Sequence, residues 1–153
     1  MGLEVFCKIE KIPCESNVAA YKDYFKVQTF NIGGSYNYDI QAESGQGATD
    51  LGAVSIAKLI DKSTANIMDA VMYKLKVPKV VIEIVNDKHK EGGRAKHLTY
   101  TLENCRITSY SHSTSDALAE NITILYRIIK FDDHFTSQKM QYDLGSPDAK
   151  KSL

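Results

Sequence analysis

The N-terminal half of the chain alternates apolar and polar residues with a period of two, which is the pattern of β-strands that bury one face. The first such segment runs from Leu3 to Ile9. Further strands are predicted at about 24–32, 52–60 and 80–86. The pattern therefore predicts a fold that is mainly β.

The period changes to about 3.6 residues in one stretch, DKSTANIMDAVMYKL. Its apolar residues form a single stripe made of Ile67, Met68, Val71, Met72 and Leu75. Ser63 or Thr64 is a suitable cap for the start of a helix, and Pro78 follows its end. We expect one amphipathic α-helix at about 62–75, with Met68 and Met72 in its buried stripe.

Two long strands are predicted between His97 and Phe131. The apolar positions of the first are Leu98, Tyr100 and Leu102, followed by Cys105 and Ile107. The alternation therefore slips by one residue near Glu103 and Asn104. A bulge or a sharp bend at this point is the simplest cause.

The second of these strands carries apolar residues on both faces. One face holds Ile122, Ile124, Tyr126 and Ile128, and the other holds Leu125, Ile129 and Phe131. One face builds the core, so the other needs a cover. Helices can cover both faces of a parallel sheet, but only one helix is predicted here. We therefore expect an antiparallel sheet covered by another subunit, with Leu125, Ile129 and Phe131 as the subunit interface.

Two segments lack a steady period. The stretch from Ser35 to Asp50 is predicted to be a long loop, which a compact domain rarely keeps without a use for it. Residues 135–153 are predicted to be a polar tail after a domain of residues 1–134, with one short strand near Met140 to Leu144.

The composition is that of one neutral domain. The chain has 153 residues, with 19 Lys and Arg against 19 Asp and Glu. Zero net charge gives no electrostatic attraction for a nucleic acid or an anionic lipid surface, so neither is an expected partner. No run approaches the roughly 18 apolar residues of a membrane helix, so no membrane insertion is expected.

The cysteines and the N-terminal residues bear on where the protein is made. Cys7, Cys14 and Cys105 are too few and too irregular for a disulfide framework, and we expect free thiols in a reducing cytoplasm. The first residues, MGLEVFCKIE, lack the basic and apolar regions of a secretory signal. No cleaved signal peptide is therefore expected.

No catalytic, metal or cofactor site is expected. Ser111, His112 and Asp116 have the residue types of a hydrolase triad, but adjacent strand residues point to opposite faces and no Gly-x-Ser-x-Gly turn is present. The histidines and cysteines lack metal-ligand spacing. The glycine pairs 33/34 and 92/93 lack the Lys-Ser/Thr of a phosphate loop. Lys58 and the charged residues of the helical region are expected on a solvated face.

Three segments in order carry a resemblance to a known family. They are EVFCKIEKI near the N-terminus, VSIAKLIDKSTANIMDA in the middle, and TLENCRITSYSHSTSD followed by ENITILYRIIK. The middle segment is similar to the family's apolar strand, Asp-Lys-Ser-Thr and helix, and the third to its Leu-Glu-Asn/Asp strand. On these segments the chain resembles the Hcp family, the tube protein of bacterial type VI secretion.

The resemblance implies a β-barrel of two antiparallel sheets with one flanking helix. It implies a structural subunit and no enzyme: six copies form a ring, and rings stack into a hollow tube. The implied partners are a contractile sheath, a VgrG spike and effector proteins in the lumen. The implied route is synthesis in the bacterial cytoplasm, then secretion without a cleaved signal peptide.

The long loop is then the natural element to reach an adjacent ring. The residues expected in this contact are Tyr36, Tyr38, Asp39, Glu43, Gln46 and Thr49. Two other functions stay open at this point: a monomeric ligand-binding β-barrel, and a small hydrolase that would need Ser111 and His112. The mass of the particle in solution separates the tube subunit from both.

Overall fold

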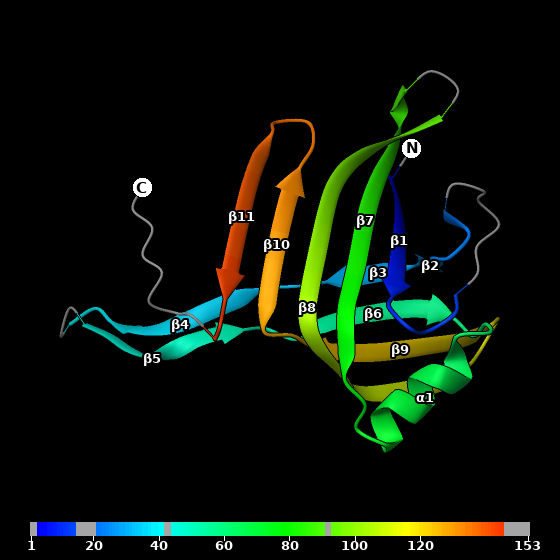
Figure 1. The fold of residues 1–153 in the computed structure, drawn as a ribbon, viewed down its shortest axis with the longest axis horizontal. Helices are drawn as coiled ribbons and strands as arrows, with labels where there is room; N and C mark the ends of the chain where they lie inside the picture. Colours follow the sequence, from blue (N-terminus) through cyan, green and yellow to red (C-terminus); the bar gives the residue numbers. More distant parts are fainter. Residues whose placement is uncertain (1–2, 15–20, 42–43, 91–92, 146–153) are drawn as a thin grey trace.

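The computed structural model describes residues 3–14, 21–41, 44–90 and 93–145 (Figure 1). Its one helix is α1 (Thr64–Met72). The strands are β1 (Leu3–Ile9), β2 (Phe25–Val27), β3 (Thr29–Asn31), β4 (Gly34–Asp39), β5 (Ser44–Leu51), β6 (Val54–Leu59), β7 (Val77–Lys90), β8 (Gly93–Thr114), β9 (Leu118–Leu125), β10 (Ile128–Asp133) and β11 (Gln138–Asp143). The prediction of a mainly β fold with one helix is confirmed.

One nine-stranded sheet wraps around the core in the order β2-β1-β7-β8-β9-β6-β3, with β10 and β11 branching from β8. The 22-residue strand β8 bends, so that its first half pairs with β7 and β10 and its second half with β9. The order begins at β2 and ends at β3, which only Gln28 separates, and the Gln28 N–H donates to Ala57 O at 2.8 Å. The predicted barrel is thus a wrapped antiparallel sheet whose hydrogen-bonded path is not itself a closed ring.

The predicted slip of alternation in β8 is confirmed. Asn104 has a φ of 55°, in the left-handed region that Asn tolerates better than most residues. Leu102 and Cys105, on either side of it, are both fully buried although they are three positions apart. The left-handed residue therefore turns both side chains inward where β8 passes from one half of the sheet to the other.

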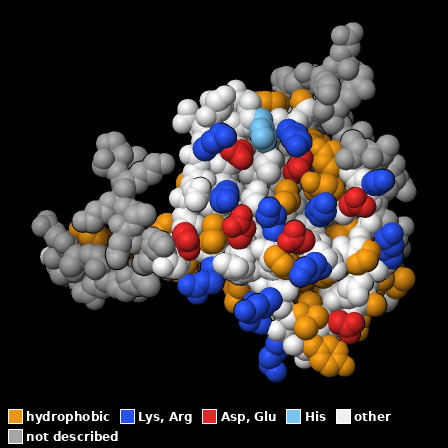
Figure 2. Space-filling view, in the orientation of Figure 1, with side chains coloured by type: hydrophobic (Ala, Val, Ile, Leu, Met, Phe, Trp, Pro, Cys, Tyr) orange, Lys and Arg blue, Asp and Glu red, His pale blue; other side chains and the backbone are white. Residues whose placement is uncertain are grey.

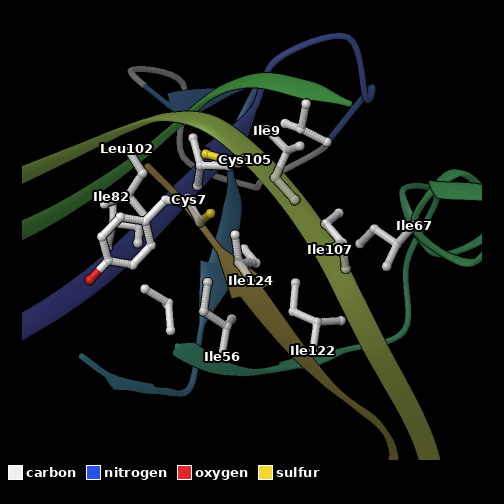
Figure 3. Close-up of a cluster of buried hydrophobic side chains, with 14 of the residues drawn as sticks. Cys7, Ile9, Ile56, Ile67, Ile82, Leu102, Cys105, Ile107, Ile122 and Ile124 are labelled. Atoms are coloured by element: carbon white, nitrogen blue, oxygen red, sulfur yellow. The ribbon is translucent and has the colours of Figure 1, made fainter. Parts of the chain in front are cut away.

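The core fills the space between the two halves of the sheet. In Figure 3, Ile82 and Leu102 of the first half lie across from Ile56, Ile122 and Ile124 of the second. All five side chains are buried. Replacing such a residue with Ala typically costs about 2–5 kcal/mol, because a cavity is left behind.

The three cysteines are free and buried, as predicted. Burial raises the pKa of Cys7 well above its usual value and raises the pKa of Cys105 to about 12. Thiols in such surroundings behave as small apolar side chains and are chemically inert.

The helix is shorter than predicted, and its buried stripe is narrower. Ile67 and Ala70 are buried, whereas Met72 is 63% exposed, so its expected place in the core is wrong. Ser63 occupies the N-cap but makes no capping hydrogen bond with its side chain. Its hydroxyl instead donates to Asp61 Oδ1 at 2.5 Å, and its N–H donates to the same oxygen at 2.9 Å, so Asp61 fixes the N-cap residue.

Two segments differ from the sequence prediction. The expected loop from Ser35 to Asp50 contains the strands β4 and β5, which pair with each other as a separate two-stranded sheet. The predicted strand through Tyr126 is two strands, β9 and β10, with a break at Tyr126 and Arg127. No helix in the described residues is long and apolar enough to cross a membrane.

Candidate interaction surfaces

The hairpin of β4 and β5 projects from the body of the molecule (Figure 1). Its base is fixed where two glycines meet, since the Gly52 N–H donates to Gly33 O at 2.9 Å. A Cβ added at Gly52 would lie 2.7 Å from that same oxygen, closer than real Cβ atoms come to a neighbour. Only glycine therefore allows the two backbones to approach in this way.

The residues expected in the inter-ring contact lie on this hairpin. Tyr36 is 62% exposed and Tyr38 is 48% exposed, and their ring centroids are 6.3 Å apart at 73°. Thr49 is exposed as well. Asp39 and Gln46 pair within the strands, but their side chains lie outside the described part, and Glu43 lies outside the described residues altogether. The structure thus places exposed aromatic rings on an extended hairpin where a loop was expected.

An apolar cavity of about 450 Å³ lies at the base of the hairpin. It is lined by the rings of Tyr36, Tyr100 and Tyr126 and by the aliphatic side chains of Leu51, Ile129 and Met140. It connects the hairpin to the end of the sheet formed by β10 and β11, so the two share one apolar surface.

The three residues predicted at the subunit interface do not share one face. Leu125 on β9 is 45% exposed, but Ile129 on β10 is only 7% exposed and belongs to the core. Phe131 is half-buried against Tyr100, with ring centroids 5.2 Å apart. The outward orientation predicted for Ile129 is wrong, because the break at Tyr126 and Arg127 resets the alternation that the prediction carried through it.

The outer face of the sheet around β7 and β8 carries paired charges of both signs (Figure 2). Neighbouring strands form four ion pairs there: Lys26–Glu4 at 3.4 Å, Lys96–Glu83 at 3.6 Å, Lys130–Glu103 at 3.1 Å and Lys139–Asp132 at 3.6 Å. The three pairs made by Lys26, Lys130 and Lys139 are exposed or half-exposed and contribute about 0–1 kcal/mol each, whereas the Glu83 carboxylate is buried. Their main effect is that this face has little net charge.

Glu83 on this face is buried by two tyrosines. The hydroxyls of Tyr21 and Tyr24 donate to its two oxygens at 3.0 and 3.1 Å, and Tyr21 stacks on Phe6 with ring centroids 4.3 Å apart. Burial, followed by the nearby Glu83 carboxylate, raises the pKa of Tyr24 to about 12. Sequence reasoning missed this cluster, although Phe6 on the supposedly outer face of β1 was a signal for it.

A second buried polar cluster joins the helix to the sheet. Lys58 Nζ lies 2.8 Å from Glu120 Oε1 and 3.0 Å from Asp61 Oδ1, and the Thr64 hydroxyl donates to Glu120 at 2.9 Å. The Lys58 and Glu120 side chains are 1% and 0% exposed. The expected solvated position of Lys58 is therefore wrong. The signal was parity, because Lys58 follows Val54 and Ile56 on the inner face of β6.

His112 belongs to the same cluster, because its Nε2 lies 3.2 Å from Glu120 Oε2. Ser111, one position away on β8, is exposed. The structure does not bring Ser111 and His112 together as a nucleophile and its base. Among the described residues, no group of three or more His, Cys, Asp or Glu side chains is placed to hold a metal ion.

Comparisons with known proteins agree on one family. Residues 6–132 match the sequence model described as "Type VI secretion system effector, Hcp". A search of curated proteins finds no match. Among solved structures, the Hcp1 protein from E. coli EAEC 042 has a TM-score of 0.81 at 14% identity, covering 94% of this chain and 99% of that one.

Two further solved structures show the same fold. Hcp1 from Salmonella typhimurium has a TM-score of 0.75 at 19% identity, covering 94% of this chain and 96% of that one. A type VI secretion system effector from Yersinia pestis has a TM-score of 0.74 at 19% identity, covering 91% and 98%. At these identities the likeness is one of fold, and it extends over nearly the whole chain.

Proposed function

Because the chain belongs to the Hcp family of type VI secretion proteins, we propose that it is the structural subunit of a type VI secretion inner tube. Six copies close into a ring, and rings stack into a hollow tube. The family is structural rather than enzymatic. The observation that carries the proposal is the family match over residues 6–132.

Exposed apolar residues support the assembly into rings. The end of the helix exposes Met72 and Tyr73, and β9 exposes Leu125. Fully burying one such side chain stabilises an assembly by about 1.5–3 kcal/mol. A ring of identical copies covers the same patch on every subunit and leaves no open end.

The free edge of β11 supports the same proposal. Among the described strands, β11 pairs only with β10, so its other edge keeps unpaired N–H and C=O groups. An open edge of this kind favours pairing with another chain. Within the ring, we assign Leu125 and Phe131 to the subunit interface, while Ile129 supports Phe131 from the core.

The hairpin is the element that we assign to the contact between stacked rings. Tyr36, Tyr38 and Thr49 are exposed on it. Asp39, Glu43 and Gln46 belong to the same proposed contact. A two-stranded hairpin is only marginally stable by itself, so packing against the next ring would hold it in place.

The proposed route and partners follow from the proposed tube. The subunit is made in the bacterial cytoplasm and exported without a cleaved signal peptide. Its partners are a contractile sheath around the tube, a VgrG spike at its tip and effector proteins in its lumen. No nucleic acid or membrane insertion has a part in this function.

Light scattering on the eluting peak of a sizing column tests the proposal. We expect a particle of about six times the 17.1 kDa mass of one chain. Negative-stain images of the same sample should show rings. A single 17.1 kDa particle at high concentration would overturn the proposal in favour of a monomeric ligand-binding β-barrel.

A further inference from the structure

A cavity of about 430 Å³ lies where β8 bends, between the end of α1 and the break that separates β9 from β10. Three basic residues line it, namely Lys76, Arg106 and Arg127, together with Asn104. Val77 and Pro78 form part of its wall. The cavity is distinct from the apolar one at the hairpin base, with which it shares no lining residue.

The cavity has three positive charges and no acidic lining residue. Among the described residues, no carboxylate lies within 4.0 Å of the charged groups of Lys76, Arg106 or Arg127. The outer face of the sheet differs, since its Lys residues have acidic partners. Figure 2 shows the same contrast, with basic and acidic side chains alternating over the upper face and basic ones gathered along the lower edge below β8 and β10.

Two of the cations are held on fixed backbone. Arg106 Nη1 donates to Lys74 O at 2.6 Å, at the end of α1, which leaves four guanidinium N–H groups for another acceptor. The Arg127 N–H donates to Glu103 O at 3.2 Å, and Arg127 O accepts from the Leu144 N–H at 2.8 Å. The guanidinium of Arg106 is therefore positioned before any ligand arrives, which reduces the entropy cost of binding, while for Arg127 the backbone is fixed.

We propose that this cavity binds carboxylate side chains of an acidic, partly apolar segment of a partner protein. Arginine matches the planar carboxylate with two parallel hydrogen bonds. Val77 and Pro78 form the apolar part of the cavity wall, and Leu75, next to Lys76, is 46% exposed. A free inorganic anion has no use for these apolar neighbours, whereas a peptide with alternating acidic and apolar residues covers both.

The net charge of the whole chain favours a short acidic segment, rather than a long polyanion, as the ligand of this cavity. The protein has zero formal net charge, so it exerts no long-range attraction on a nucleic acid. The three cations act only over short distances, because salt screens exposed charges beyond about 8 Å under physiological conditions. The ligand is thus recognised locally, by a few carboxylates with apolar residues between them.

Fluorescence anisotropy with the full chain tests the proposal, using a labelled peptide in which Glu and Leu alternate. We expect saturable binding, and we expect Arg127→Glu and Lys76→Gln each to weaken it about tenfold, as the loss of one charge-assisted hydrogen bond implies. Lys22→Glu, which removes an exposed cation far along the sequence from the cavity, should leave the affinity unchanged. Thermal melts confirm that each variant is folded.

Three outcomes would overturn the proposal. Equal binding of a peptide with Gln in place of Glu would show that the carboxylates are not recognised. Full displacement by inorganic phosphate, with a Ser-for-Leu peptide binding as well as the Leu peptide, would make the cavity a site for small anions. A changed particle mass in Arg127→Glu would assign the cavity to a contact between copies. The binding is measured per chain, so failure of ring formation does not affect this test.

Discussion

Lys58 and Glu120 lie opposite each other on β6 and β9 and form an ion pair of 2.8 Å between side chains that are 1% and 0% exposed. Removing one partner breaks a buried ion pair, which typically costs about 3–5 kcal/mol, although Lys58 keeps Asp61 and Glu120 keeps Thr64 and His112 as neighbours. The position is unusual because Thr64, at the start of α1, also donates to Glu120. The pair therefore connects the helix to both strands.

We predict that Lys58→Met and Glu120→Leu each lower the free energy of unfolding by about 3–5 kcal/mol, since each breaks a buried ion pair and keeps the other charge buried. The double variant should be more stable than either single one, because both charges are gone. Urea unfolding monitored by circular dichroism measures all three. Lys139→Met, in an exposed pair, is the control, with an expected change below about 1 kcal/mol. Additive effects of the two single changes would contradict the prediction.

The subunit interface is tested by two substitutions that differ in burial. Leu125→Asp places a charge at a position that is 45% exposed, so the chain should stay folded while the ring dissociates to monomers. Ile129→Asp places the same charge in the core, so it should unfold the chain. Light scattering gives the particle mass, and thermal melting gives the stability. A Leu125→Asp variant that keeps the full ring mass would remove Leu125 from the interface.

The role of the hairpin is tested by the double variant Tyr36→Ser and Tyr38→Ser. It should abolish the stacking of rings into tubes and leave the ring mass and the melting temperature unchanged, because both rings are exposed in the single chain. Leu118→Ser at the start of β9 is the control, since it removes an apolar side chain of similar exposure elsewhere on the surface. Electron micrographs of the parent chain, the double variant and the control show whether tubes form. Tubes of normal length in the double variant would refute the assignment of the hairpin to the contact between rings.

The close approach at the hairpin base predicts that Gly52→Ala destabilises the hairpin more than Gly34→Ala does. In Gly52→Ala the new Cβ meets Gly33 O at 2.7 Å, so the backbone must shift, at a cost of about 1–3 kcal/mol. In Gly34→Ala the nearest atom is Asp50 O at 3.5 Å, an ordinary contact. Hydrogen exchange of the hairpin amides should be faster in Gly52→Ala alone. Equal exchange in both variants would show that the approach imposes no constraint.

The environment of Tyr24 predicts a loss of stability in alkali. Burial and then Glu83 raise its pKa from 10.0 to about 12 in the folded chain. A group whose folded pKa is raised contributes stability below its unfolded pKa, and this contribution is lost as the pH rises toward the folded value. Stability should therefore fall between about pH 10 and 12, and less steeply in Tyr24→Phe. Denaturant midpoints over this range give the slope, with Tyr73→Phe as the control that should follow the parent chain.

The sequence predicts most elements of this fold because core-facing residues produce a clear period. The alternation places β1 and β6, the helical stripe places α1, and the slip near Asn104 marks the bend of β8. The short strand β11 is also found in the polar segment where one was expected. The elements β1, β6, α1 and β8 bury one face or stripe, so their pattern can be read from the residues alone, whereas β11 is largely exposed.

The features that the sequence prediction missed share one cause. In each of them, which side chains are buried does not follow from the order of apolar and polar residues. From Gly34 to Asp50, every hairpin residue whose burial the structure describes is exposed, so no alternation of buried and exposed residues marks these strands. The apolar run through Tyr126 continues past the break, so one strand was expected where there are two. Lys58 and Glu120 follow the inward parity of their strands, but their charge suggested the surface. In each case the neighbouring elements decide the outcome.

The place of β1 in the sheet sets the order in which the protein can be completed. The short strand β2 pairs with one edge of β1, and the partner on the other edge, β7, begins only at Val77, with Leu3 opposite Asn86. During synthesis, β1 therefore cannot pair with β7 until more than half of the polypeptide has left the ribosome. During that interval only the three-residue strand β2 can pair with β1, so the apolar residues Phe6, Cys7 and Ile9 stay largely uncovered and expose the newly made chain to aggregation.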